Sequence, residues 1–383
     1  SLSELSMAAF AVILNIYLRR LGYSKSFLGV FTTINLLSSG FISIPAGIIA
    51  DKYGRKGALL ISIVVASVAC IGQVVFTTSV ILLLAFSALR GASNTFKGIV
   101  RSPLLVDNSG PRERMHLFSV NSALSHLSAV LGSSLGGLMP MFIIDTLGMT
   151  QNLDIAPLRI SLIIAALFWL LSALPVFFMS ELKLPKSASK RESVFMALQN
   201  PIARSLAVHN MFIGFGAGLV VPFFNVFLTE KLVASTEQIG FIMAGSQVVL
   251  TVAVLVTPLL VKKFGKVKSV VLTQGASVPL LLVMALSPSI WVVTVAYWLR
   301  NSLMNMSQPI TGSFSMEIVP QNQRATTSSL MSMSNNLTRA VSATVGGFMM
   351  DRVSLGSPYF GTAVIYTLGI IFYYRSFTKL EKK

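Results

Sequence analysis

The sequence has little charge and almost no cysteine. Only 11% of its 383 residues are charged, and the one cysteine is Cys70. A lone thiol excludes an intrachain disulfide and a thiolate metal cluster, and we expect no metal site. A charged fraction far below the quarter or so typical of soluble domains excludes an ordinary water-soluble protein. The sequence also lacks the GxxxxGK[ST] phosphate loop, so ATP-driven transport is disfavoured, and we expect neither a cofactor nor an enzyme.

Long apolar runs make up most of the chain. Hydrophobic residues account for 54% of it, and the mean hydropathy is +0.75. Apolar runs of about 18 residues or more can cross a hydrocarbon core as helices, because lipid offers no partner to backbone polar groups. The sequence therefore predicts an all-α protein embedded in a lipid bilayer. The expected spans are 1–18, 26–50, 57–78, 80–106, 115–143, 158–179, 202–228, 238–261, 267–287, 290–316, 325–350 and 358–376.

The basic residues are placed as the topology of a membrane protein would place them. The net charge is +17, but most Lys and Arg residues lie between apolar runs, and nothing about them indicates nucleic-acid binding. They are concentrated in alternate connections and in the segment 375–383, which predicts that both termini are cytoplasmic in a multi-pass plasma-membrane protein. The polar, basic stretch 181–200 is expected to link a first bundle, 1–180, to a second, 201–383.

The two halves of the chain repeat one another. Shifting the sequence by 210 positions aligns like residues without a gap, and Gly29 and Gly54 align with Gly240 and Gly265 after one insertion. Two copies of one six-helix bundle are therefore expected, with a substrate site at the midplane between them. The gap-free pairs are Arg90 with Arg300, Asp107 with Glu317, Arg114 with Arg324, Gly136 with Gly346 and Gly137 with Gly347.

The connection after the second span carries a specific motif, GIIADKYGRK, which contains Gly47, Asp51, Lys52, Gly54, Arg55 and Lys56. It resembles the loop signature of the major facilitator superfamily, and the resemblance implies twelve helices in two pseudo-symmetric bundles. It also implies a conformational latch in which Asp51 and Arg55 cluster with Asp107. Arg114, Glu317 and Arg324 complete the expected latch set, although the second-half loop has Lys262 in place of the first acid. The alternative is a basic cytoplasmic loop with incidental acids.

A polar stripe follows the fourth span. Arg90, Asn94 and Lys97 are spaced by four and three residues and so share one helix face, which must avoid lipid. By resemblance, the first, fourth, seventh and tenth helices line the central cavity. Alternatively, Arg90 and Arg300 brace the bundles by binding backbone carbonyls. The other expected cavity residues are Asn210, Asn225, Arg300, Asn301, Asn305 and Gln308.

Two titratable groups are candidates for proton coupling. The 210-residue shift sets Glu4 about a dozen residues into a span, and the chain begins at Ser1 rather than Met, so the first helix is expected to be truncated and Glu4 to lie near mid-membrane. If the helix instead starts at Ser1, Glu4 is an interfacial residue favoured by the helix N-terminus. His126, within the fifth span, is the second candidate, and its alternative role is packing.

Glycines recur on the fifth and eleventh spans, at Gly132, Gly136, Gly137, Gly346 and Gly347. Small residues permit close helix packing. The pattern also resembles the fifth-helix motif of antiporters in the superfamily, but it lacks that motif's proline.

The sequence therefore predicts a secondary active transporter that moves a small molecule by alternating access. The overall resemblance to drug:proton antiporters favours proton-coupled efflux of lipophilic or drug-like compounds by a monomer. The alternatives are a proton-coupled carrier of an organic anion, amphiphile or sugar and, in another class, a membrane receptor or scaffold that transports nothing.

Overall fold

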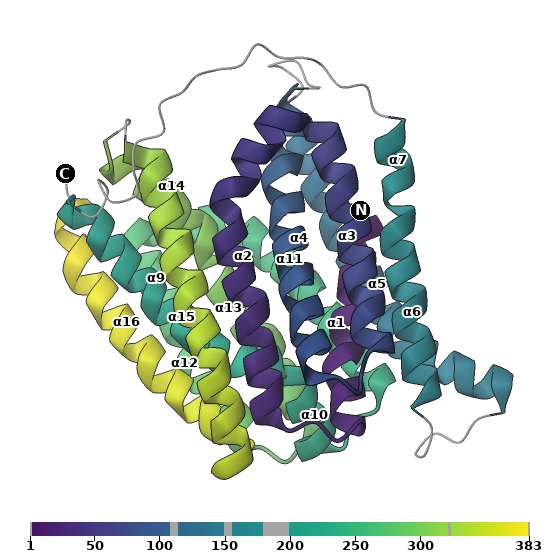
Figure 1. The fold of residues 1–383 in the computed structure, drawn as a ribbon. Helices are drawn as coiled ribbons and strands as arrows, with labels where there is room; N and C mark the ends of the chain where they lie inside the picture. The colour runs from purple at the N-terminus through teal and green to yellow at the C-terminus, as the bar shows by residue number, and fades with distance from the viewer. Residues whose placement is uncertain (1, 108–113, 149–154, 179–198, 321–322, 382–383) are drawn as a thin grey trace. The chain divides into compact units, whose positions relative to one another are not determined.

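A computed structural model describes residues 2–107, 114–148, 155–178, 199–320 and 323–381, with side chains except at 43–53, 55, 101–107, 114–119, 122–123 and 325. Helices account for nearly all of these residues, and no strand occurs among them (Figure 1). They form the twelve spans that the hydropathy predicts, and the all-α expectation is confirmed. The first six spans are α1 (Leu2–Arg20), α2 (Lys25–Tyr53), α3 (Arg55–Val75), α4 (Val80–Asp107), α5 (Arg114–Leu147) and α6 (Ala156–Leu171) with α7 (Ala173–Phe177). The second six are α9 (Pro201–Val220) with η1 (Val221–Phe223) and α10 (Phe224–Leu232), α11 (Thr236–Phe264), α12 (Lys266–Leu286), α13 (Ile290–Asn305) with α14 (Ser307–Ile318), α15 (Arg324–Arg352) and α16 (Ser357–Glu381).

Three spans are broken, and a proline lies at or four residues after each break. A proline inside a helix lacks an N–H, and its ring clashes with the carbonyl four residues earlier. Helix α6 ends at Leu171 and α13 ends at Asn305, four residues before Pro175 and Pro309 respectively. Pro222 lies in the short 3₁₀ turn η1 that separates α9 from α10.

The chain divides into two compact units. Unit 1 comprises Ser1–Ser24, Ile34–Ala188 and Ala234–Ala244, and unit 2 comprises Lys25–Thr33, Ser189–Val233 and Gly245–Lys383. Each unit therefore includes the first turns of one helix whose remainder belongs to the other unit. These turns open α2 and α11, which the 210-residue repeat aligns.

Helix α1 is the central helix of unit 1. Val12, Ile13 and Leu18 have no exposed surface, and Tyr17 is 2% exposed. The Tyr17 hydroxyl donates a hydrogen bond of 3.1 Å to the Val74 carbonyl of α3, so this buried polar group is satisfied. The helix also packs against α5 and α6.

Unit 2 is organised around α9, α12 and α16. Helix α9 packs against α15 and α16, and α12 packs against α13 and α16. Together with α14 these helices form a buried apolar cluster made of Leu206, Val267, Val270, Ile310, Phe314, Val319, Tyr373 and Phe377.

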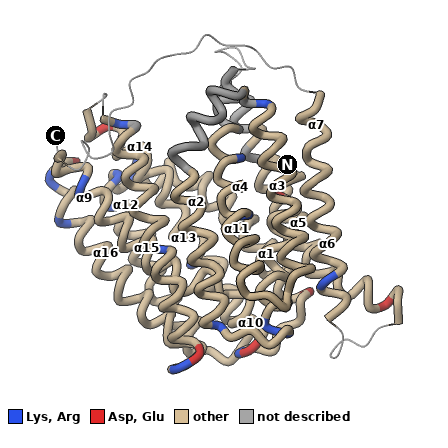
Figure 2. The backbone as a smooth tube through the Cα atoms, in the orientation of Figure 1, with Lys and Arg blue, Asp and Glu red and all other residues tan. Residues whose placement is uncertain are grey.

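Apolar side chains also cover outward-facing helix surfaces. Seven described helices, in full or in part, are long and apolar enough to cross a membrane: Leu2–Arg20, Lys56–Val75, Leu124–Leu147, Ala156–Phe177, Pro201–Leu232, Thr236–Phe264 and Lys266–Leu286. On α11 an exposed stripe of Phe241, Val248, Val252, Leu255 and Leu259 follows helical spacing, which suits contact with lipid and not with water. Charged residues lie mostly at the helix ends, and few lie part-way along (Figure 2).

Candidate functional site

An ion pair lies inside unit 1, between α1 and α4. The Lys97 ammonium is 3.4 Å from a Glu4 carboxylate oxygen and 3.4 Å from the Ser3 hydroxyl. It also lies 5.2 Å from the centre of the Trp169 ring of α6. The Lys97 side chain is 7% exposed and the Glu4 side chain 25%. The lysine is thus enclosed, whereas its carboxylate partner stays accessible.

The depth of this pair follows from helix geometry. Glu4 is sixteen residues from Arg20, the last residue of α1, and Lys97 is seventeen residues from Val80, the first residue of α4. These two helix ends lie together, because the Tyr23 hydroxyl donates to the Thr77 carbonyl. At ~1.5 Å per residue the pair therefore lies about 25 Å along both helices. It is therefore past the mid-point of a core roughly 30 Å thick and nearer the boundary on the side of the α1 N-terminus. The sequence did not predict that Lys97 is the partner of Glu4.

Arg90 is about two helical turns from Lys97 on the same stripe of α4. Its guanidinium lies 5.3 Å from the centre of the Phe10 ring of α1, a cation–π contact. Asn94, between them in sequence, is half-buried. The three side chains that the spacing predicted to share a face therefore turn toward the interior of unit 1.

A second cationic centre lies in unit 2. Arg300 of α13 is 4% exposed, and its guanidinium donates a hydrogen bond of 3.1 Å to the Tyr366 hydroxyl of α16. It also lies 5.6 Å from the centre of that ring, and within electrostatic range of Tyr297 and Tyr359. The aromatic ring and hydroxyl of Tyr366 are thus the close partners that the structure shows for Arg300.

Arg339 of α15 is a site residue that our sequence interpretation overlooked. The residue as a whole is half-buried, and its guanidinium interacts electrostatically with both Tyr366 and Arg300. The available signal was its position, thirteen residues from Arg352 inside a 29-residue helix. The repeat gave no help, because the residue 210 positions earlier is Ala129.

Amides form a ladder along α13 and the start of α14. The Asn305 amide donates to the carbonyl and the side-chain oxygen of Asn301 at 2.7 and 2.9 Å. Gln308 donates to the Asn305 side chain at 2.9 Å. Asn210 of α9 is also half-buried, and its carbonyl accepts a hydrogen bond of 3.3 Å from Asn335 of α15.

Asn225 is placed differently from the other amides. It is 5% exposed at the start of α10, where its side chain accepts a hydrogen bond of 2.9 Å from the Val226 N–H. This local contact gives Asn225 a role in the turn after η1.

Most of the first-half latch lies outside the described side chains. This applies to Gly47, Asp51, Lys52, Arg55, Asp107 and Arg114. Gly54 precedes α3 with φ of 95°, a left-handed conformation that favours glycine, and its repeat partner Gly265 precedes α12 with φ of 79°. The Lys56 ammonium donates a hydrogen bond of 2.8 Å to the Phe177 carbonyl.

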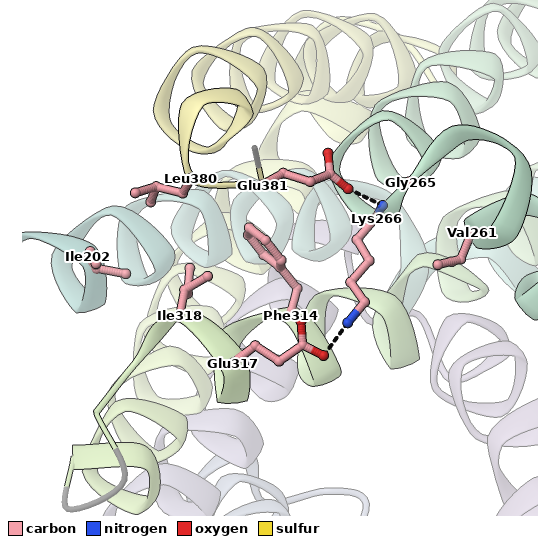
Figure 3. Close-up of a pocket in the computed structure, with 9 residues that line it drawn as sticks. All are labelled: Ile202, Val261, Gly265, Lys266, Phe314, Glu317, Ile318, Leu380 and Glu381. Carbon is pink, nitrogen blue, oxygen red and sulfur yellow. Dashed lines mark hydrogen bonds and ion pairs between the residues drawn. The ribbon is translucent and has the colours of Figure 1, made fainter. Parts of the chain in front are cut away.

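In unit 2 the side chains equivalent to the latch, Lys266, Glu317 and Arg324 among them, lie in the described part of the chain, and Figure 3 shows the first two. The Lys266 ammonium pairs with Glu317, and the Glu381 carboxylate accepts from the backbone N–H groups of Lys266 and Val267, the latter at 3.0 Å. Glu381 thus caps the N-terminus of α12. Arg324 does not join them, since its Nε donates to the Val319 carbonyl at 3.4 Å. These groups border a cavity of about 580 Å³ lined also by Ile202, Val261, Phe314, Ile318 and Leu380.

The predicted packing glycines lie at close helix contacts. A Cβ atom on any of the five would strike backbone of a neighbouring helix within the same unit. The partners are Leu5 for Gly132, Ala9 for Gly136, Thr236 and Gly240 for Gly137, Leu219 for Gly346, and Lys25 for Gly347.

Two histidines have contrasting surroundings. His126, the proton-coupling candidate, is exposed on α5. His209 of α9, which we did not single out, is 2% exposed, with its ring 4.5 Å from that of Tyr373 and Nδ1 3.4 Å from the Gly369 carbonyl. Its contacts are those of a packing residue.

Comparisons with known proteins identify the architecture. The model of the Major Facilitator Superfamily matches residues 1–213 and 206–383. A bacterial homologue of the human lysosomal transporter Spinster, in an inward-facing occupied state, superposes with a TM-score of 0.78 at 17% identity, covering 99% of this chain and 96% of that one. A mutant form of the nucleoside transporter NupG gives 0.78 at 13% identity, covering 98% of each chain. A bacterial homologue of the iron transporter ferroportin gives 0.71 at 13% identity, covering 98% and 95%. These identities establish a shared fold only, and no curated protein matches the sequence.

Proposed function

Because this chain belongs to the Major Facilitator Superfamily, and is therefore a membrane transporter and not an enzyme, we propose that it couples solute movement to protons through Glu4. The observation that carries the proposal is the pair formed by Glu4 and Lys97, 3.4 Å apart within the helices of unit 1. A largely enclosed ion pair is costly to bury, and ionisable groups within spanning helices are usually functional.

The unequal exposure of the two partners supports a coupling role. Glu4 keeps 25% of its side chain exposed and can exchange protons, while Lys97 is 7% exposed and fixed against Trp169. A proton on Glu4 removes the negative charge that lies 3.4 Å from the lysine ammonium, and weakening the compensation of a buried cation is unfavourable. An anionic group of the cargo restores the balance, so that proton and anion bind together.

This linkage makes an amphiphile or other organic compound with an anionic group the best-supported cargo. Arg90 and Lys97 on α4, and Arg300 and Arg339 in unit 2, place four cations in the spanning helices. Proton and cargo would then move in the same direction.

Efflux of lipophilic or drug-like compounds remains the second candidate, and the exposure of Glu4 favours it. A lipophilic cation could take the place of a proton at this carboxylate, which would produce exchange. Flexible methionine side chains can line an adaptable pocket for such cargo. Met304 and Met306 give the efflux candidate little support, because they are 7% and 4% exposed and serve helix packing.

The direction of proton movement separates the two candidates. We would reconstitute the protein in vesicles that contain a pH-sensitive dye, and add decyl phosphate, decyl glucoside or decyltrimethylammonium outside. Internal acidification with decyl phosphate supports the anion carrier, and internal alkalinisation with decyltrimethylammonium supports efflux by exchange. Glu4→Gln should abolish either response, whereas Glu237→Gln, at an exposed position of α11, should leave it intact.

A transporter-shaped receptor or scaffold would give no response to any of the three amphiphiles, and neither would it respond to a wider panel of solutes. Flux that does not depend on the pH gradient and is unaffected by Glu4→Gln would instead show that the protein transports its cargo without coupling to protons.

The proposed topology has both termini in the cytoplasm, as the distribution of Lys and Arg predicts. Cys70 is buried, so a cysteine introduced at Lys379, near the end of α16, should be the accessible thiol in labelling experiments. In intact cells it should resist a membrane-impermeant maleimide and become reactive after permeabilisation. Labelling before permeabilisation would invert the orientation.

A further inference from the structure

Two arginines lie within electrostatic range of each other inside unit 2, and both interact with the same tyrosine. Arg300 on α13 donates to the Tyr366 hydroxyl, and Arg339 on α15 interacts with both the tyrosine and Arg300. The Tyr366 ring packs closely against α9 at Gly216, where a Cβ would overlap the ring.

The three side chains lie at similar depths. Arg300 is ten residues from Ile290, Arg339 thirteen from Arg352 and Tyr366 nine from Ser357. These helix ends lie together, because Gly356 of the last connection is in contact range of Ala285, just before α13. At ~1.5 Å per residue the group lies about 14 to 20 Å along each helix, near the middle of a bilayer.

Like charges at this depth require an anion. Isolated charges in low dielectric are expensive, and two cations near each other add repulsion. In unit 2, the carboxylates with ion pairs in the described part of the chain serve lysines: Glu230 and Asp351 pair with Lys25, and Glu317 with Lys266. No described carboxylate forms an ion pair with Arg300 or Arg339.

Hydrogen-bond donors remain available at the same place. The Nε atoms of Arg300 and Arg339 are buried without a partner among the described residues, and so is the hydroxyl of Tyr359. Arg300 and Tyr359 are 4% and 0% exposed, so water offers little compensation. Unsatisfied buried donors are uncommon in folded proteins and call for an explanation.

The surroundings of the cations are aromatic. Tyr297 stacks on Phe224 of α10 with ring centres 3.7 Å apart, and Tyr359 packs against Phe227 at 4.5 Å. Both tyrosines are within electrostatic range of Arg300. A cationic centre beside apolar rings suits a ligand with a charged head and a hydrophobic body.

We propose that Arg300 and Arg339 bind the oxyanion head, a phosphate or carboxylate, of an amphiphilic cargo, with Tyr359 and Tyr366 as hydroxyl donors. This inference rests on the transport function proposed above and specifies the class of its cargo. Guanidinium groups present paired N–H donors that match such oxyanions, and these charge-assisted bonds are the strong ones.

Equilibrium binding tests the site without flux. We would place the intact protein in phosphatidylcholine nanodiscs and record thermal unfolding against decyl phosphate, decyl glucoside and decyltrimethylammonium. Decyl phosphate should raise the unfolding temperature in a saturable way and the other two should not. Equal stabilisation by all three compounds would show that the protein recognises only their decyl chain, and would overturn the proposal.

Substitutions then locate the site. Arg339→Gln should weaken decyl phosphate binding about ten- to a hundredfold, as expected for the loss of charge-assisted hydrogen bonds, and Arg339→Lys should weaken it less. Arg352→Gln, exposed at the end of the same helix, is the matched control and should bind as the wild type does. Arg300→Gln should resemble Arg339→Gln. If Arg300→Gln fails to fold, the comparison of Arg339→Gln with Arg339→Lys decides. Wild-type affinity for decyl phosphate in Arg339→Gln overturns the proposal.

The source of the oxyanion is distinguished by two further arms. A solute site should keep its affinity for decyl phosphate when phosphatidylglycerol is added to the nanodisc, and inorganic phosphate should compete only at much higher concentration. Loss of affinity in proportion to the anionic lipid would assign the arginines to a bilayer headgroup and overturn the cargo assignment. If decyl phosphate does not bind but proton-coupled flux is intact, the arginine site is refuted and the transport proposal stands. If decyl phosphate binds but no flux is measured, the site stands and the transport proposal is refuted.

Discussion

The Lys25 ammonium lies 3.6 Å from the Asp351 carboxylate, although the two residues are 326 positions apart. The same carboxylate accepts hydrogen bonds from the backbone N–H groups of Lys25 and Ser26, at 3.2 and 2.6 Å, and from the Ser26 hydroxyl at 2.6 Å. Asp351 therefore caps the N-terminus of α2 from the end of α15, within unit 2.

Asp351→Asn should destabilise the protein. It replaces one of the two acceptor oxygens by an NH₂ group and removes the negative charge, which leaves Lys25 with Glu230, 3.0 Å away, as its charged partner. The expected loss is about 1 to 2 kcal/mol, because the Asp351 side chain is 20% exposed and water compensates in part. Thermal unfolding in nanodiscs measures it. Asp145→Asn, exposed near the end of α5, should change little, and an equal effect of both substitutions would contradict the assignment.

The contribution of Asp351 should depend on pH. Partial burial raises the pKa of its carboxyl, but the hydrogen bonds from Ser26 and Lys25 and the charge of Lys25 outweigh this, so that the pKa lies below its usual value. A lowered folded pKa gives stability that is present above the unfolded pKa and is lost as pH falls through the folded one. The difference in unfolding temperature between wild type and Asp351→Asn should be constant above roughly pH 4 and should shrink below it. A difference that grows on acidification would reverse the sign of the linkage.

The contact between Gly137 and Gly240 should not tolerate a methyl group. A Cβ on Gly137 would lie 2.7 Å from the Thr236 carbonyl oxygen and 2.8 Å from the Gly240 Cα, closer than real contacts allow. Gly137→Ala and Gly240→Ala should each cost about 1 to 3 kcal/mol through overpacking of α5 against α11. Gly312→Ala, on an exposed and open face of α14, should be neutral or slightly stabilising. Equal thermal stability of all three variants would show that α5 and α11 do not pack closely enough at Gly137 and Gly240 to exclude a methyl group.

The sequence predicted the parts of this structure that depend on periodicity and on the repeat. Hydropathy located the twelve spans, and the 210-residue shift singled out Gly137 and Gly347, which both lie against the backbone of another helix. Helical spacing brought Arg90, Asn94 and Lys97 onto one face. These features are local or are copied between the halves.

The partners across helices were not predictable in the same way. Nothing in the spacing indicates that Lys97 meets Glu4, because that contact depends on how α1 packs against α4. Arg339 was missed for the opposite reason, since it has no counterpart in the first half, and its significance comes from Tyr366 and Arg300 on other helices. The division of α6 from α7 was also missed, although Pro175 marks it.

Separate and joint removal of the Glu4 and Lys97 charges should show whether they act as a pair. Glu4→Gln removes the carboxylate charge 3.4 Å from an ammonium that is 7% exposed, which should cost about 3 kcal/mol, the lower end of the range for a buried pair. Lys97→Met leaves the more exposed carboxylate, which can take up a proton, so the cost should be smaller. The double variant should be more stable than Glu4→Gln alone, because it no longer contains an uncompensated buried charge. Thermal unfolding of the four proteins in nanodiscs gives the coupling energy. Additive losses would show that the two charges are energetically independent and would remove the physical basis for placing proton coupling at Glu4.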